Sequence, residues 1–560
     1  MNLITRFPNL FVLLALTNLA SQAATEDRSQ ARSMVISRYG IVATEHPLAS
    51  QIGARVLARG GNAVDAAVAA NAAMGVFAPM ANGIGGDLFA MIYEAKTGKL
   101  YGLNASGWAP AGLTPGLLAS KGITTMPTNG IYSVTVPGAV DGWEKLLSRF
   151  GRKKLSELLA PAIRYAEEGF PVTEIFSSYW IASERKLRKS ENGAKTFLLD
   201  GKAPRPGQLF RNPELAWAYR QIAAHGRKAF YEGAIAKRIL ACSDANRGVM
   251  TAEDLSRFSS EWVTPISTTY HGWTVYELPP NGQGIAALEM LNLMENFPLA
   301  DFGPGSPNDL HAMIEAKKLA YADLVRYVCD PRSNRVPVAG ILSKDYARAR
   351  GQLIDMAKAN CNVSAGEPPP MGPDTTYLCV VDADGNMVSY IQSNYSSFGS
   401  GVVPEGTGFA LHNRGGLFSL NAESPNVLAG RKRPLHTIIP AFMSQGKVRI
   451  AFGIMGGWNQ SQAHAQFVSN LVDHKMNIQA ALEAPRFTKG TFEGCDVELE
   501  SRFPMMTRSE LAARGHKIEL RGDFASSVGG GQAVMRDFET GINYGASDPR
   551  KDGAAIPELR

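Results

Sequence analysis

A change of composition just before residue 375 constrains the fold more than any other feature of this sequence. The segment Cys361–Asp374 is rich in proline and glycine and has no apolar periodicity, which is typical of a linker. Two runs of strand-forming residues follow directly, at 375–382 and 387–393, with Asp384-Gly385 in the turn between them. An Asp-Gly pair between two such runs indicates a β-hairpin. The chain therefore passes from a linker straight into a hairpin at Thr375.

The register of this hairpin predicts what surrounds Thr375. A two-residue loop at Asp384-Gly385 places Ser393 and Asn394 opposite Thr376 and Thr375. Ser393 is then only one position away from the residue that lies directly opposite Thr375. We therefore expect two hydroxyl side chains to be neighbours at the point where the linker ends.

A threonine at this position has the chemistry that self-cleavage requires. Its hydroxyl can attack the preceding carbonyl, that of Asp374, and hydrolysis of the resulting ester frees the α-amino group of Thr375. An α-amine has a pKa near 8, so it can act as the general base for its own hydroxyl without a histidine. Two threonines at a strand start are more often simply good strand formers, so this interpretation needs support from elsewhere in the chain.

A glycine pair later in the chain gives some of that support. Gly456-Gly457 lies between a predicted strand at 449–453 and a predicted helix with Ala463, Phe467 and Leu471 on one face. Backbone N–H groups at a glycine pair that opens a helix form a natural oxyanion hole. A plain tight turn is the alternative for this feature taken alone.

The first part of the chain is predicted to mix helices and strands. We expect a helix that ends at Gly60-Gly61, a second helix with Asn62 and Asp65 at its start, and a short helix at 114–120. Further helical patterns occur at 155–169, 212–241 and 306–327, and a strand pattern at 273–278. With 560 residues and 45% hydrophobic content the chain can bury a large core, which excludes general disorder.

The first 24 residues have the layout of a cleavable secretory leader. Arg6 is followed by an apolar run at 10–16 and by small residues up to Ala24, so we expect cleavage near Ala23 and a periplasmic or secreted protein. The apolar run is shorter than the roughly 20 residues that a spanning helix needs. No later segment is long enough either, so no membrane association is expected once the leader is removed.

Composition argues against several other classes of function. The net charge of +6 comes with short basic clusters that lack interleaved aromatic residues, so no nucleic-acid partner is expected. The nine histidines and five cysteines are dispersed, without H-E-x-x-H or C-x-x-C motifs, so neither a metal nor another cofactor is predicted. The cysteines permit one disulfide but not a framework of several.

At these residues the sequence resembles the gamma-glutamyltransferase family of N-terminal nucleophile hydrolases, over essentially the whole chain after the leader. The matching segments occur in family order: Gly60–Ala67, Gly83–Phe89, Val136–Gly138, Leu278–Pro280, Asp374–Thr376, Lys432–Leu435, Gly456-Gly457 and Tyr544–Arg550. The resemblance implies an α+β fold with four layers, αββα, and no cofactor. It also implies a proenzyme that is cut between Asp374 and Thr375.

The same resemblance assigns subunits and catalytic roles. A large subunit (25–374) would end in the linker 361–374, and a small catalytic subunit (375–560) would begin with the nucleophile Thr375. Gly456 and Gly457 would form the oxyanion hole, and Ser393 would replace a supporting threonine.

The substrate pocket is where the sequence departs from that family. Standard members hold the glutamyl α-carboxylate with an arginine, and the corresponding residue here is Ser106. Three further ligands of the α-carboxylate and α-amino groups correspond to Tyr395, Arg414 and Leu417. A pair of serines becomes His436 and Thr437.

These replacements change what the pocket can bind. Leu417 cannot hold an ammonium group, whereas Arg414 adds a guanidinium group that can clamp a carboxylate. A zwitterionic head group without partners in an apolar site loses several kcal/mol. The alternative for Arg414 is a surface or interdomain ion pair.

Three functions are compatible with these observations. The first is hydrolysis or transfer of the acyl group of gamma-glutamyl amides such as glutathione, a small-molecule amide substrate. The second is an amidohydrolase or acylase for carboxylated acyl amides without an α-amino group, of the glutaryl-cephalosporin acylase or oxamate amidohydrolase type. The third is a secreted binding or scaffold protein that keeps the fold without activity, for which the intact nucleophile and glycine pair leave little room.

Overall fold

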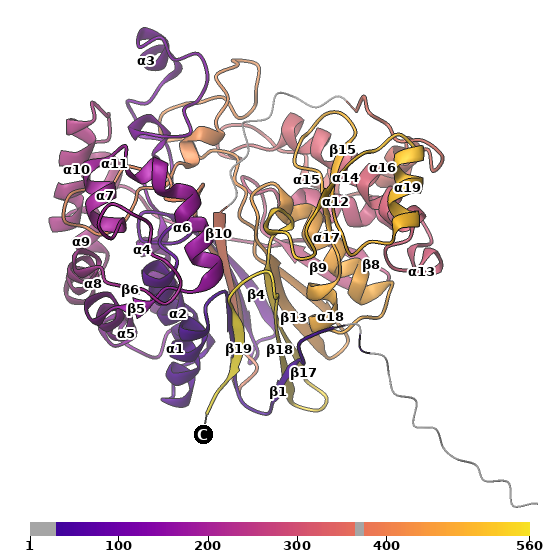
Figure 1. The fold of residues 1–560 in the computed structure, drawn as a ribbon, viewed down its shortest axis with the longest axis horizontal. Coiled ribbons are helices and arrows are strands. Elements are labelled where there is room, and N and C mark those ends of the chain that lie inside the picture. Colours follow the sequence, from indigo (N-terminus) through magenta and orange to yellow (C-terminus); the bar gives the residue numbers. More distant parts are fainter. Residues whose placement is uncertain (1–27, 29, 364–373, 560) are drawn as a thin grey trace, which may run out of the picture.

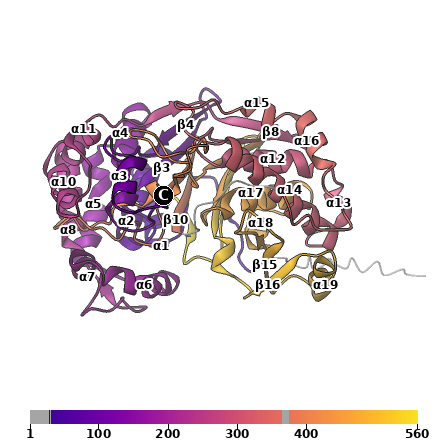
Figure 2. The ribbon, with the colours of Figure 1, turned by 90° about the horizontal axis from the view of Figure 1, so that it is seen from above.

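Two seven-stranded sheets lie face to face in the centre of the molecule, with helices on both outer sides (Figures 1 and 2). The computed structural model describes residue 28, residues 30–363 and residues 374–559, and in Asp374 only the backbone. The predicted leader and residues 364–373 of the predicted linker lie outside the described residues. In the described part, no helix is both long and apolar enough to cross a bilayer.

The first sheet contains, in spatial order, β1 (Val35–Ser37), β18 (Ile542–Ser547), β17 (Gly531–Asp537), β13 (Val448–Ile454), β12 (Ala441–Gln445), β9 (Trp273–Glu277) and β8 (Ile266–Tyr270). The second sheet contains β19 (Ala554–Pro557), β2 (Ile41–Thr44), β10 (Asp374–Val381), β11 (Met387–Tyr395), β3 (Asp87–Glu94), β4 (Lys99–Ala105) and β7 (Glu261–Val263). Neighbouring strands are antiparallel throughout both sheets.

The helices on the side of the second sheet come from the first half of the chain. They are α1 (Pro47–Ala58), α2 (Ala63–Phe77), α3 (Pro115–Ser120), α4 (Ala139–Phe150), α5 (Leu155–Glu168), α6 (Glu174–Leu187), α7 (Glu191–Phe197), α8 (Pro213–His225), α9 (Arg227–Tyr231), α10 (Ala234–Ala245) and α11 (Ala252–Ser256). A small pair of strands, β5 (Phe170–Pro171) and β6 (Leu209–Phe210), joins this layer.

The helices on the side of the first sheet come from both halves of the chain. They are α12 (Gly284–Met294), α13 (Leu299–Phe302), α14 (Pro307–Tyr327), α15 (Val338–Ile341), α16 (Lys344–Gly351), α17 (Asn459–Val472), α18 (Ile478–Glu483) and α19 (Met505–Ala513). A three-stranded sheet of β14 (Phe487–Thr488), β15 (Asp496–Glu500) and β16 (Lys517–Arg521) lies beside them. The short turns η1 (Ile131–Ser133), η2 (Arg414–Leu417) and η3 (Ser526–Val528) complete the elements.

Alternation along the central strands explains the four layers. In β11, Val388 and Tyr390 pack among the helices, whereas Met387 and Ile391 pack between the two sheets. Successive strand residues point to opposite faces, so a strand buried on both faces needs apolar side chains at nearly every position. The αββα layering and the α+β class predicted from the resemblance are therefore confirmed.

Most of the predicted elements are present, with the caps that the sequence indicated. Asn62 accepts hydrogen bonds from the N–H groups of Val64 and Asp65 at the start of α2, and the Asp65 side chain closes a capping box. Thr114 caps α3, because its side-chain oxygen accepts a hydrogen bond from the N–H group of Leu117.

Residues 212–241, which were predicted to be helical, form three successive helices, α8 to α10. The chain turns at Gly226, whose φ of 59° is left-handed and cannot continue a right-handed helix. Gly233 separates the next two helices.

The hairpin register differs by one residue from the prediction. Asp382 donates its N–H to the carbonyl of Asn386, so the loop has three residues instead of two, with Gly385 at a left-handed φ of 86°. Thr376 therefore lies opposite Gln392 and not opposite Ser393. A bulge between Asp374 and Thr376 shifts the pairing again at the start of β10.

Candidate functional site

Thr375 lies at the start of β10, in the middle of the second sheet, and is only 1% exposed. Its Oγ1 donates a hydrogen bond to Oγ of Ser393 at 3.1 Å. The N–H of Tyr395 donates to the same Ser393 oxygen at 2.7 Å, which fixes the acceptor. The predicted pair of neighbouring hydroxyls is present because the bulge compensates for the shift of the hairpin register.

The glycine-rich segment 82–86 supports both strands of this hairpin. Asn82 donates its side-chain N–H to Oγ1 of Thr376 at 2.5 Å, and Gln392 donates to the carbonyl of Gly83. A Cβ atom on Gly86 would lie 2.5 Å from the carbonyl oxygen of Ser393, so no larger residue fits there. The segment is thus a tight turn, and it holds the strand that carries Ser393.

Gly456 and Gly457 connect β13 to α17, with left-handed φ values of 127° and 58°. Within the described residues, neither of their N–H groups donates a hydrogen bond to the protein. The carbonyl of Gly457 accepts one from Nε2 of Gln283 at 2.8 Å, and the same nitrogen donates to the carbonyl of Thr437 at 2.5 Å. Two unpaired N–H groups at the start of a helix have the donor chemistry of an anion site.

Arg414 is fully buried in η2, at 0% exposure. It donates from Nη1 to Oγ1 of Thr437, and its guanidinium carbon lies 4.7 Å from the centre of the Tyr395 ring. Among the described residues, its Nε and Nη2 have no hydrogen-bond partner and no acidic group forms an ion pair with it. A buried guanidinium with two unpaired nitrogens is costly unless a ligand supplies the partners.

Asp87, at the start of β3, is the acidic group that affects the pKa of Arg414 most. Burial favours protonation of Asp87, but His412, His436 and Arg414 outweigh it and hold the pKa of its carboxyl below the ordinary value. Burial lowers the pKa of Arg414 to about 10, with Asp87 acting against that shift, so the guanidinium is charged at neutral pH.

His436 serves as a neutral hydrogen-bond donor to Asp87. Its Nδ1 accepts the N–H of Ile438, so the proton is on Nε2, which donates to Oδ2 of Asp87 at 2.9 Å. Burial, followed by the charge of Arg414, lowers the pKa of His436 to about 3. The other oxygen of Asp87 accepts the N–H of Gly107 at 3.0 Å.

The two remaining predicted pocket residues, Ser106 and Leu417, are both fully buried. Ser106 donates its hydroxyl to Oδ1 of Asn104 at 2.7 Å and accepts from Asn281 at 3.3 Å. Leu417 is 0% exposed and packs in the apolar core beneath the first sheet, three residues from Arg414.

A continuous series of contacts connects most of the predicted site residues. Thr375 contacts Ser393, which is bound to the backbone of Tyr395, and the ring of Tyr395 stacks on Arg414. Arg414 then contacts Thr437, which Gln283 links to Gly457. This series of contacts links the N-terminal end of β10 to η2, to the segment around Thr437 and to the glycine pair before α17.

Sequence reasoning missed Asp87, His412 and Gln283. Asp87 lies inside the matching segment Gly83–Phe89, and a lone acidic residue in an otherwise apolar run was the available signal. His412 and Gln283 stand in loops without a pattern, so only the tertiary structure identifies them.

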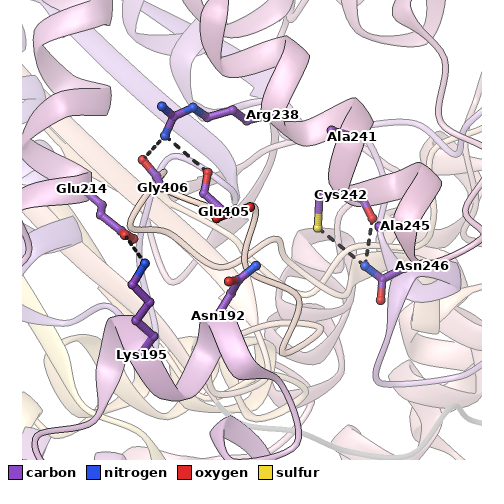
Figure 3. Close-up of a pocket in the computed structure, with 10 residues that line it drawn as sticks. All are labelled: Asn192, Lys195, Glu214, Arg238, Ala241, Cys242, Ala245, Asn246, Glu405 and Gly406. Carbon is purple, nitrogen blue, oxygen red and sulfur yellow. Dashed lines mark hydrogen bonds and ion pairs between the residues drawn. The ribbon is translucent and has the colours of Figure 1, made fainter.

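Charged side chains also line a surface pocket of about 470 Å³ that contains none of the predicted site residues (Figure 3). Lys195 is paired with Glu214 at 3.6 Å, and Arg238 donates to the carbonyls of Glu405 and Gly406. Burial raises the pKa of Cys242 in this pocket to about 11, so its thiol is a poor nucleophile at neutral pH. The two cationic side chains described here, Lys195 and Arg238, thus both have partners, unlike Nε and Nη2 of Arg414.

One group of side chains in the described part of the chain has metal-ligand geometry: His311, Glu315 and His516. The two histidines already share a hydrogen bond, Nδ1 to Nε2, at 2.8 Å. Nζ of Lys318 lies 2.6 Å from Oε1 of Glu315 and balances its charge. A buried ammonium in this position disfavours a second cation, so the group does not fit a metal ion.

Comparisons with known proteins agree with the sequence motifs. Residues 49–558 match the family described as Gamma-glutamyltranspeptidase. The chain is 38% identical over 527 residues to a glutathione hydrolase-like YwrD proenzyme of Bacillus subtilis, covering 93% of this chain and 99% of the relative. It is 34% identical over 532 residues to an oxamate amidohydrolase proenzyme of Klebsiella pneumoniae, covering 93% and 98%.

Among solved structures, the cephalosporin acylase from Bacillus halodurans is similar in both sequence and fold. The identity is 41% and the TM-score is 0.89, and the match covers 97% of this chain and 99% of the acylase. The acylase therefore shares the architecture described above, and the three relatives carry names that refer to three different substrates.

Proposed function

The chain belongs to the gamma-glutamyltranspeptidase family and is an amide hydrolase, and we propose that Thr375 is the nucleophile with which it cuts first its own chain and then its substrates. The observation that carries this proposal is the buried hydrogen bond from Oγ1 of Thr375 to Oγ of Ser393 at the N-terminal end of β10. It fixes the hydroxyl of the residue whose nitrogen belongs to the Asp374–Thr375 peptide bond.

In the cleavage step, Oγ1 of Thr375 attacks the carbonyl carbon of Asp374. The C–N bond breaks, an ester forms, and the former amide nitrogen leaves as the α-amino group of Thr375. Water then hydrolyses the ester, which frees the carboxylate of Asp374 and regenerates the hydroxyl. The products are a large subunit, 25–374 after leader removal, and a small subunit, 375–560.

In the substrate step, the α-amino group of Thr375 takes the proton of Oγ1 as the hydroxyl attacks the amide carbonyl. The unpaired N–H groups of Gly456 and Gly457 supply donors for the oxygen that becomes negative. The protonated amine transfers the proton to the leaving nitrogen, and water or an acceptor amine releases the acyl group from Thr375.

Arg414 supports a carboxylate on the acyl group of the substrate. Its Nε and Nη2 are unpaired and suit the two oxygens of a carboxylate. Among the described residues of the predicted pocket, each oxygen of Asp87 already accepts a hydrogen bond and Leu417 is apolar, so neither is a ready partner for an α-ammonium group. This favours carboxylated acyl amides without an α-amino group, of the glutaryl type. Gamma-glutamyl amides are the second candidate, favoured by the names of relatives such as the B. subtilis proenzyme.

The N-terminal sequence of the smaller fragment in purified protein tests the nucleophile. We expect it to begin TTYLCVVD, and we expect Thr375→Ala to leave the chain uncut, because alanine has no hydroxyl to attack Asp374. A fragment that begins at another residue, or cleavage that persists in the variant, would contradict the proposal.

A comparison of glutaryl and gamma-glutamyl anilides tests the substrate class. We expect a higher kcat/KM for the glutaryl compound, and a loss of about 10- to 100-fold for it in Arg414→Met, since charge-assisted hydrogen bonds contribute about 1.5–3 kcal/mol. Butyryl anilide, which has no carboxylate, is the matched control and should be turned over equally by both proteins. Faster turnover of the gamma-glutamyl compound by the native enzyme would favour the second candidate instead.

We also propose that the protein works in the periplasm or outside the cell. The leader-like first 24 residues support this, and so does a disulfide between Cys361 and Cys495, because disulfides persist mainly in oxidising compartments.

A further inference from the structure

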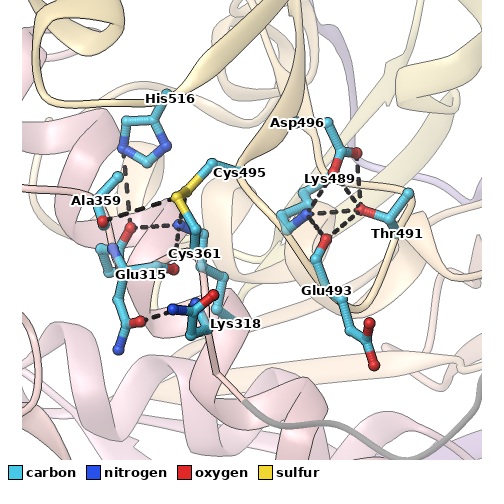
Figure 4. Close-up of a disulfide and its surroundings, with 12 residues drawn as sticks. Glu315, Lys318, Ala359, Cys361, Lys489, Thr491, Glu493, Cys495, Asp496 and His516 are labelled. Carbon is cyan, nitrogen blue, oxygen red and sulfur yellow. Dashed lines mark hydrogen bonds and ion pairs between the residues drawn. A yellow bond between two sulfur atoms is a disulfide. The ribbon is translucent and has the colours of Figure 1, made fainter.

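The disulfide joins two residues on opposite sides of the proposed cleavage site. Cys361 and Cys495 are bonded through their sulfur atoms, with Cα atoms 4.9 Å apart and 134 positions apart in the sequence (Figure 4). The loop that this bond closes contains the Asp374–Thr375 peptide bond. In the described residues the other cysteines, Cys242, Cys329 and Cys379, are free thiols.

The large-subunit side of the disulfide is held in place by hydrogen bonds. Ala359 donates its N–H to the carbonyl of Arg514 at 2.8 Å. Asn360 donates its N–H to Oε2 of Glu315 at 3.2 Å, and its carbonyl accepts from Nζ of Lys318 at 3.0 Å. The backbone that leads to Cys361 therefore has a fixed position before the linker begins.

The small-subunit side is held equally well. Cys495 is 2% exposed and immediately precedes β15, and its carbonyl accepts the N–H of Lys517 from β16 at 2.7 Å. Nζ of Lys318 lies 3.5 Å from the sulfur atom of Cys495. The two cysteines are thus brought together by folded structure on both sides, independently of residues 364–373.

We infer that Cys361–Cys495 becomes a covalent link between the two subunits once the chain is cut, an inference that rests on the proposed cleavage between Asp374 and Thr375. Cutting one peptide bond inside a disulfide-closed loop adds one water molecule and releases no chain. The mature enzyme is then a single covalent molecule with two N-termini and two C-termini.

This link adds to an interface that is already interleaved. In the second sheet, β10 and β11 of the small subunit pair with β2 and β3 of the large subunit. The disulfide lies elsewhere, beside the three-stranded sheet of β14 to β16 and near α14 and α19. It therefore ties the end of the large subunit to a part of the small subunit that the central sheets do not contain.

Intact-mass measurement on full-length purified protein tests the inference. Free thiols are first blocked with N-ethylmaleimide, to prevent exchange, and the protein is denatured with and without dithiothreitol. Without reductant we expect one species, heavier than the uncut chain by one water. With reductant we expect two species, which correspond to the large subunit and to 375–560.

Cysteine variants supply the matched controls. Cys361→Ser and Cys495→Ser should each give two separate subunits even without reductant. Cys242→Ser, which removes a cysteine that is free in the structure, should behave like the native protein. Two separate subunits from the native protein without reductant would overturn the inference.

A separate variant distinguishes failure of this inference from failure of the proposed cleavage. Thr375→Ala is combined with the recognition sequence of a site-specific protease in place of residues 366–372. After digestion, one species without reductant and two with it would support the link even if the native chain proved not to cut itself. Two species without reductant would overturn the link.

Discussion

At the scale of single residues, Arg414 and Asp87 are the most informative side chains of this site. Arg414 is buried with two unpaired nitrogens, and Asp87, which balances its charge, has both oxygens occupied. The alternative role of Arg414 as a surface or interdomain ion pair does not agree with its complete burial and its lack of an ion-pair partner in the described residues. Two unpaired guanidinium nitrogens have the donor geometry that a carboxylate needs, which agrees with the proposed role of Arg414.

Ser393 should set the rate of self-cleavage through its bond to Thr375. We expect Ser393→Ala to slow the appearance of the 375–560 fragment about tenfold, because one oriented hydrogen bond contributes about 0.5–1.5 kcal/mol. Ser393→Thr keeps the hydroxyl and should retain most of the rate. The measurement is a time course of freshly purified precursor on a reducing gel.

Ser389→Ala is the matched control for that experiment. Ser389 lies on the same strand and is buried like Ser393, but its hydroxyl contacts Tyr377 at 2.8 Å instead of Thr375. If Ser389→Ala slows cleavage as much as Ser393→Ala, the effect comes from disturbing β11 and not from the hydroxyl pair.

At the scale of elements, the sequence patterns predicted those features that depend on short-range interactions. The capping box of α2, the strand at 273–277 and the strand, glycine pair and helix around Gly456 follow from short-range rules, and all are present. The sequence also placed the hairpin correctly. Its exact register depended on whether the loop had two or three residues, which the Asp-Gly pair alone does not determine.

Other features of the site depend on tertiary contacts and could not be predicted from local sequence patterns. The hairpin register is shifted by one residue, and the bulge at the start of β10 brings Thr375 back beside Ser393. No local sequence pattern predicts that bulge. Gly86 is required because the backbone of Ser393 passes 2.5 Å from where its Cβ would lie, which is a long-range constraint. Asp87 is likewise held by His436, which is 349 residues away in the sequence.

At the scale of the whole molecule, the two proposed subunits share each central sheet. Strands β1, β8 and β9 of the large subunit and β12, β13, β17 and β18 of the small subunit form the first sheet, so neither subunit can complete it alone. The two apolar layers that flank the sheets draw on both parts of the chain. Separate subunits would therefore expose large apolar surfaces, and their reassembly would depend on how quickly they meet.

The disulfide should make this reassembly independent of concentration. When the cut enzyme is unfolded in denaturant without reductant, Cys361–Cys495 keeps both fragments in one molecule, so their encounter on refolding is intramolecular. In Cys361→Ser the same encounter is between two molecules. A tenfold dilution should leave the rate of recovered amidase activity unchanged for the native enzyme and lower it about tenfold for the variant, as a second-order step requires. Cys242→Ser should follow the native enzyme. An equal dependence on concentration in native enzyme and variant would mean that the link does not hold the fragments together during refolding.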